Sequence, residues 1–104
     1  MESWENASDS ERKTYESISH VFSSCPHLLN NFFEKDKPKI RFRSEKMLAQ
    51  ACGLSSGEIV LVKVALDIWS GSGNAYVWEL IETLDGQNFY SVLNALVLIR
   101  RNRF

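Results

Sequence analysis

Hydrophobic positions recur every three or four residues along most of this chain, which is the period of an α-helix. The most apolar stretches are Ser56 to Trp69 and Gln87 to Arg101, where hydrophobic residues lie almost all the way round a helical wheel. A helix that packs on one side of a monomer needs an apolar face of only about half that width. The pattern therefore predicts more apolar helix surface than a small domain usually buries.

Capping residues indicate where the helices begin. Ser55 and Glu58 form a capping box before the stretch at 56–69, and Asp85 can cap the one at 87–101. Asn74 is expected to cap a helix between these two. The apolar face predicted for that middle helix consists of Val77, Leu80, Ile81 and Leu84.

Three shorter helices are predicted in the first half of the chain, at 9–24, 26–34 and 44–52. Between the last two of these, Pro38 breaks helicity, and Ile40 and Phe42 alternate with basic residues, as in an extended segment with one buried side. Whether this extended segment pairs as a strand stays open. The sequence predicts an all-α fold, a compact bundle of five or six short helices with one extended basic segment, forming a single domain over 1–104.

The net charge of −1 hides a strong segregation, because residues 35–46 hold six bases and two acids. These bases could steer an acidic protein or hold nucleic-acid phosphates, although charge runs commonly just face water. The candidate basic patch consists of Lys37, Lys39, Arg41, Arg43 and Lys46.

The run from Leu48 to Ser55 has a small residue at Ala49, a turn glycine at Gly53 and an apolar Leu54. Together with the apolar Ile59 and Val62 in the helix that follows, this run resembles the helix-turn-helix signature of bacterial and phage regulators. The resemblance implies that the helix at 56–69 enters the DNA major groove. We expect a core helix instead, because the residues it would present to DNA include none of the Arg, Lys, Asn and Gln side chains on which base recognition relies. Those residues are Ser55, Ser56, Gly57, Val60, Leu61 and Val64.

No pattern in the chain predicts a metal, a cofactor or a catalytic centre. His20, Cys25 and His27 match no established zinc spacing, and no nucleophile motif is present. Cys25 and Cys52 are expected to be reduced thiols, and the start of the chain lacks the features of a signal peptide. We expect a cytoplasmic protein that is not an enzyme and has no membrane span.

The helix at 87–101 has two interpretations. It is either a central core helix surrounded by the others, or it exposes part of its wide apolar face to a partner. Next to it, Tyr76 and Trp78 lie off the main apolar face of the middle helix, and aromatic residues are enriched at interfaces. The candidate partner-binding residues are Tyr76, Trp78, Tyr90 and Leu98.

These observations predict a small adaptor, inhibitor or regulator that binds another protein and self-associates, for instance as a homodimer. The alternative is a small helix-turn-helix-like regulator that binds nucleic acid, in which the basic patch provides most of the grip.

Overall fold

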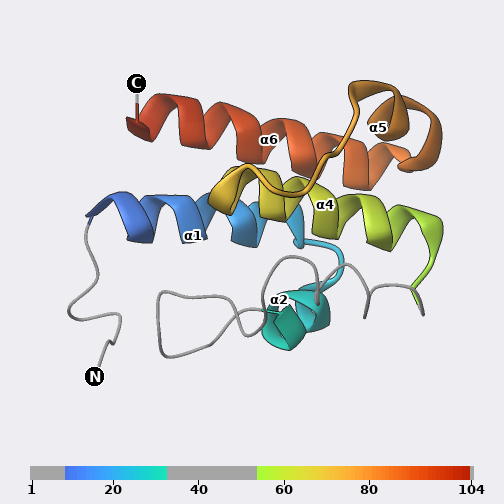
Figure 1. The fold of residues 1–104 in the computed structure, drawn as a ribbon, viewed down its shortest axis with the longest axis horizontal. Coiled ribbons are helices and arrows are strands. Elements are labelled where there is room, and N and C mark those ends of the chain that lie inside the picture. The colour runs from blue at the N-terminus through green and yellow to red at the C-terminus, as the bar shows by residue number, and fades with distance from the viewer. Residues whose placement is uncertain (1–8, 33–53, 104) are drawn as a thin grey trace.

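The computed structural model describes residues 9–32 and 54–103, and in these ranges the chain forms α-helices and no strand (Figure 1). The all-α prediction is thus confirmed for the described part of the chain. The helix predicted at 44–52 and the extended basic segment lie outside it. The helices are α1 (Asp9–Val21), α2 (Pro26–Phe32), α4 (Ser56–Ser70), α5 (Val77–Thr83) and α6 (Gly86–Arg103).

The long helices α1, α4 and α6 pack together into a compact globule, with α1 against both α4 and α6 (Figure 1). The short helix α5 packs on α4, near the beginning of α6, and α2 packs on α1 at the opposite side of the molecule. None of the described helices combines the length and the apolar character that crossing a membrane requires.

α4 supplies the largest share of the core in the described residues. Its apolar residues surround the helix, so neighbours on several sides bury them, and its buried residues are Val60, Leu61, Val62, Val64, Ala65 and Leu66. α1 adds Ile18 and Val21, the turn after it adds Phe22, and the described part of α6 adds only Val92 and Ala95. The interpretation of α6 as a surrounded core helix is therefore wrong, because one face of α6 packs against the globule and the other stays exposed.

Two predicted helix starts are confirmed. The Ser55 amide donates to Glu58 Oε1 at 3.0 Å and the Glu58 amide donates to Ser55 Oγ at 3.2 Å, which is a complete capping box. At the start of α6, the Asn88 amide donates to Asp85 Oδ1 at 2.8 Å. Each cap joins residues three apart, so the local sequence is sufficient to specify it.

α1 ends earlier than predicted, at Val21 rather than residue 24. The chain there tightens into a turn, in which the amides of Ser23 and Cys25 donate to the carbonyls of His20 and Phe22, three residues back rather than four. The Ser23 hydroxyl donates to the same His20 carbonyl at 2.7 Å. This side-chain bond competes with continuation of the helix.

Asn74 does not cap α5, which corrects the prediction. Its backbone is left-handed, with φ of 56°, and its amide donates to Asp67 Oδ1 at 2.9 Å. The N-cap residue is Tyr76, whose side chain makes no capping bond. The physical reason is a long-range one, since Asp67 binds the chain before α5 and delays the helix until Val77.

Candidate functional site

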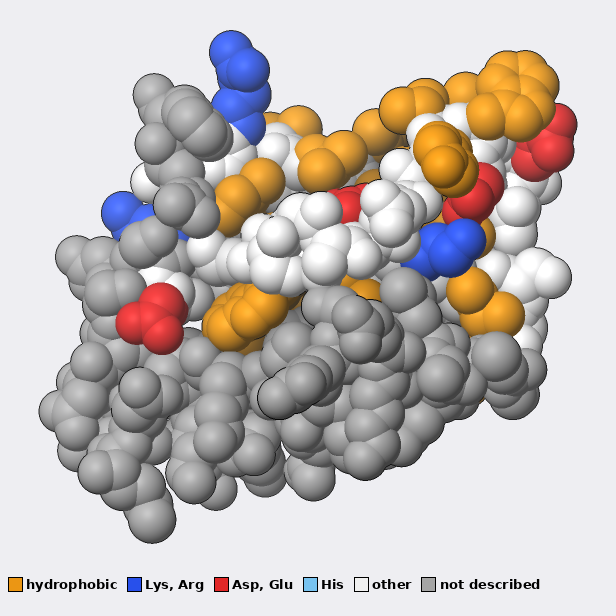
Figure 2. Space-filling view, viewed as in Figure 1, with side chains coloured by type: hydrophobic (Ala, Val, Ile, Leu, Met, Phe, Trp, Pro, Cys, Tyr) orange, Lys and Arg blue, Asp and Glu red, His pale blue; other side chains and the backbone are white. Residues whose placement is uncertain are grey.

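Large hydrophobic side chains are exposed on α5 and on the outer face of α6, where they gather along the upper edge of the molecule (Figure 2). We call this set the outer surface. Its three aromatic members are Tyr76, Trp78 and Tyr90, which are 67%, 65% and 66% exposed. The full set is Tyr76, Val77, Trp78, Ile81, Tyr90, Leu93, Leu96 and Val97.

The two faces of α6 explain its part of the outer surface. Val92 and Ala95 are fully buried against the globule, whereas Leu93 and Val97 point to the other side of the helix. At about 100° per residue, Leu98 lies about 140° from Leu93. Accordingly, Leu98 is only partly exposed and is not part of the outer surface, unlike the other three candidate partner-binding residues.

α5 contributes more than the sequence predicted. Val77 and Ile81 were expected to face the core, but they are 74% and 51% exposed. Only Leu80 and the following Leu84 pack against the core cluster, because this seven-residue helix touches the globule along a narrow line. These two exposed residues add to the apolar area that Trp78 presents on α5.

A groove of about 350 Å³ lies between α4, α5 and α6. Val77 and Leu96 belong both to its lining and to the outer surface, so the parts of that surface on α5 and α6 are continuous through the groove. A mostly apolar recess beside exposed aromatics can receive a side chain of a binding partner. The lining residues are Val64, Asp67, Ile68, Ala75, Val77, Leu80 and Leu96.

Asp67 holds the groove wall in place. Its carboxylate accepts hydrogen bonds from the amides of Gly73 (2.8 Å), Asn74 (2.9 Å) and Ala75 (2.8 Å). Gly73 is buried against α4, where a Cβ atom would overlap the carbonyl of Lys63. Since Asp67 already binds the Gly73 amide, this turn is an internal structural link, and nothing in the sequence pattern signalled the role of Asp67.

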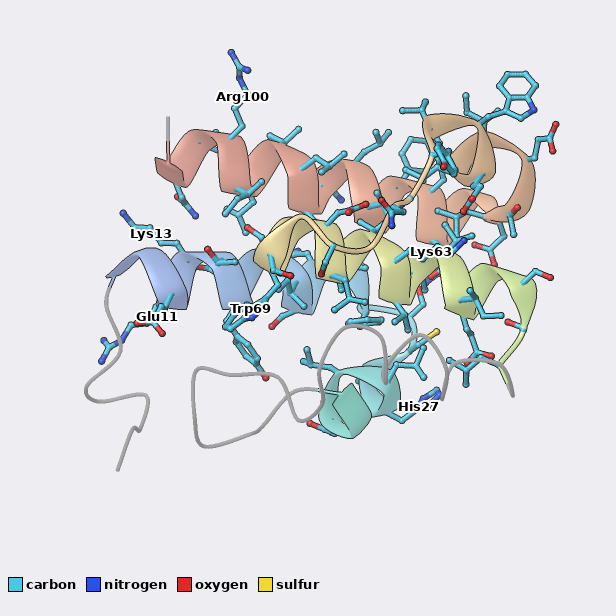
Figure 3. The ribbon with its side chains drawn as sticks, in the orientation of Figure 1. Glu11, Lys13, His27, Lys63, Trp69 and Arg100 are labelled. Atoms are coloured by element: carbon cyan, nitrogen blue, oxygen red, sulfur yellow. The ribbon has the colours of Figure 1, made fainter. Side chains whose placement is uncertain are left out.

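An ion pair fixes α5 on α4 as well. Lys63 Nζ lies 3.3 Å from Glu79 Oε2, with both side chains partly buried (Figure 3). Lys63 and Asp67 lie one turn apart on α4, and each is bound to the segment that follows this helix. α5 is thereby held at both its beginning and its middle, so the outer surface is preorganised.

The titratable groups near α2 form a structural contact. His27 Nε2 lies 3.6 Å from Glu58 Oε2, and the bonds that Glu58 accepts within the capping box, with help from His27, lower the pKa of this carboxyl. Burial, and then the Glu58 and Asp85 carboxylates, raise the pKa of the Cys25 thiol, which disfavours the reactive thiolate. In the described ranges, no group of three metal-ligating side chains comes together.

Half of the residues that the helix-turn-helix resemblance would present to DNA are buried in the fold. Val60, Leu61 and Val64 are buried in the core, so they cannot meet base edges while the fold is intact. The first helix of the pair and the whole basic patch, Lys37, Lys39, Arg41, Arg43 and Lys46, lie outside the described residues. Comparisons of the chain with protein-family models, curated proteins and solved structures give no match.

Proposed function

We propose that this protein acts by binding another protein through the outer surface, as a small adaptor, inhibitor or regulator without catalytic activity of its own. The observation that carries the proposal is the exposure of Tyr76, Trp78 and Tyr90 among the apolar residues of the outer surface. Aromatic residues with two-thirds of their area in water are costly for an isolated monomer and are enriched in protein interfaces.

The size of the outer surface supports the same proposal. From the exposed fractions of its members, backbone and hydroxyl atoms included, it presents on the order of 900 Å² to solvent, about half of it from the three aromatic residues. The largest apolar patch of an ordinary monomer measures about 300–600 Å² and is itself often functional. The excess over that range favours a surface that is covered during function.

Preorganisation is the third support. The Asp67 hydrogen bonds and the ion pair between Lys63 and Glu79 hold α5 before any partner arrives. A surface that is already ordered loses little conformational entropy on binding. A location in the cytoplasm is part of this proposal, because two cysteines are too few for the disulfide framework of a small secreted domain.

The test is the substitution Trp78→Ala. Because Trp78 is largely exposed, we expect the free energy of unfolding to change by less than about 1 kcal/mol. We expect the affinity for the partner to fall about 30-fold or more, as for a central aromatic residue of an interface. Partners are captured on the wild-type protein from source-cell extract, then purified and titrated by calorimetry against wild type and variant.

The control is Lys13→Ala, an exposed position on α1 away from the outer surface (Figure 3), for which we expect wild-type affinity. If Trp78→Ala and the double variant Trp78→Ala, Tyr90→Ala both bind the purified partner as tightly as wild type does, the outer surface is not the binding site and the proposal fails.

A further inference from the structure

We infer that the outer surface binds a second copy of this chain, forming an antiparallel two-fold dimer in which α6 of one copy packs along α6 of the other. This inference rests on the proposed function, because it assigns a partner to the same surface. Three features of the surface lead to it, namely its area, its stripe of apolar residues and the arrangement of charges at its two ends.

The area matches what a dimer of this chain needs. A stable interface of standard size buries about 800 Å² on each partner. The outer surface exposes on the order of 900 Å² of apolar residues, which is enough by itself. In a two-fold dimer both copies use the same patch, so one apolar surface per chain is sufficient and no second complementary surface is required.

The outer face of α6 has the pattern of a helix that packs lengthwise on another helix. Leu93, Leu96 and Val97 are followed by Arg100, which gives the spacing i, i+3, i+4 and i+7, and Tyr90 lies one turn earlier. α6 has 18 residues, so it offers a straight contact about 27 Å long. The stripe is apolar in its middle and charged at its carboxyl-terminal end.

The charges at the two ends of the surface are opposite. Arg100 and Arg101 are exposed at the end of α6, and Arg100 projects away from the globule (Figure 3). At the other end, α5 lies beside the beginning of α6 (Figure 1) and carries the exposed Glu82 four residues after Trp78, on the same side of the helix. Glu79, the other α5 carboxylate, is already paired with Lys63.

These charges select the antiparallel orientation. A two-fold axis between Leu93 and Val97 brings Tyr90 of one copy opposite Arg100 of the other, where the guanidinium can stack on the ring. The same axis brings the α5 end, with Glu82, near Arg101. A parallel pair would instead place the arginines of both copies side by side, and like charges across an interface are unfavourable.

The experiment measures the mass of the full chain by sedimentation equilibrium at about 1–100 µM, the range in which modest dimers dissociate. We expect wild type to approach the mass of two chains. Glu82→Lys alone, or Arg101→Glu alone, should weaken the dimer about tenfold, because each puts like charges together. The double reversal of Glu82→Lys with Arg101→Glu keeps the contact between Arg100 and Tyr90, so it should restore the wild-type mass. Lys13→Glu on α1 should leave the mass unchanged.

A wild-type mass of one chain throughout this range overturns the dimer. The proposed function then still stands if Trp78→Ala loses affinity for the purified partner, and it fails separately if Trp78→Ala does not. A dimer whose mass is insensitive to both charge reversals overturns the antiparallel arrangement. In a parallel pair, each of these residues would face the same residue of the other chain, and reversing its charge would leave like charges opposite each other.

Discussion

Asp67 shows how much one side chain can decide. Its carboxylate accepts hydrogen bonds from three backbone amides of the segment that follows α4. Hydrogen bonds to a charged acceptor are stronger than those between neutral groups. The segment is therefore drawn onto α4, and this contact sets where α5 begins and which of its side chains face outward. Gly73 permits the close approach because it has no Cβ atom.

Gly73→Ala is expected to destabilise the fold. The new methyl group would overlap the Lys63 carbonyl, so the loop must move and weaken the hydrogen bonds to Asp67. We expect a loss of about 2 kcal/mol or more in the free energy of unfolding, measured by urea denaturation.

Gly86→Ala is the matched control, because nothing lies within 4 Å of the position of its Cβ. We expect this variant to lie within about 1 kcal/mol of wild type, on the stabilising side. Equal destabilisation by both substitutions would contradict the packing described for Gly73.

At the scale of the element, α6 combines two functions in one helix. Its inner face, with Val92 and Ala95, holds the helix on the globule, and its outer face is apolar without being buried. α5 is different, since it has no fully buried residue and seven residues are too few for a stable isolated helix. It depends on the Asp67 hydrogen bonds, the ion pair with Lys63 and the packing of Leu80.

A matched pair of valine substitutions separates the two faces of α6. Val92→Ala removes fully buried methyl groups, so we expect a loss of about 2 kcal/mol in the free energy of unfolding. Val97 is 56% exposed, so Val97→Ala should change the unfolding of the isolated chain by about 0.5 kcal/mol or less.

The effects of these two substitutions on dimer formation should be the reverse of their effects on unfolding. Val97→Ala is expected to weaken the dimer measured by sedimentation, whereas Val92→Ala should leave the dissociation constant of the folded protein nearly unchanged. Wild-type dissociation of Val97→Ala, together with weaker association of Val92→Ala, would place the interface on another face.

At the scale of the whole molecule, an apolar surface that is covered only in a dimer couples association to folding. A partner that binds only the folded state stabilises it by about 2.7 kcal/mol at a hundred times its dissociation constant. For a domain of this size, each kcal/mol raises Tm by about 4–8 °C.

We therefore expect the Tm of wild type to rise by several degrees between about 1 and 100 µM chain, measured by circular dichroism. Trp78→Ala should show a smaller rise, because the free chain gains less from association. A wild-type Tm that does not depend on concentration would contradict self-association in this range, independently of the measured mass.

The sequence alone determined the features that depend on neighbours a few residues apart. The helical period of α1, α4 and α6 and the caps at Ser55 and Asp85 are local, because each joins positions within one turn. The apolar excess of α6 is likewise a property of its own residues. Tyr76, Trp78 and Tyr90, chosen from this pattern, are all about two-thirds exposed.

The tertiary structure alone decided how the apolar area is divided between core and surface. A helical wheel shows how much of a helix is apolar, but burial depends on which helices pack against it and from which side. For that reason Val77 and Ile81 face outward and Leu98 lies off the exposed stripe. Asp67 binds amides six to eight residues further along the chain, a longer separation than the three or four residues that join neighbours on a helix. Only the packed structure could therefore show that Asn74 is held in the turn and does not cap α5.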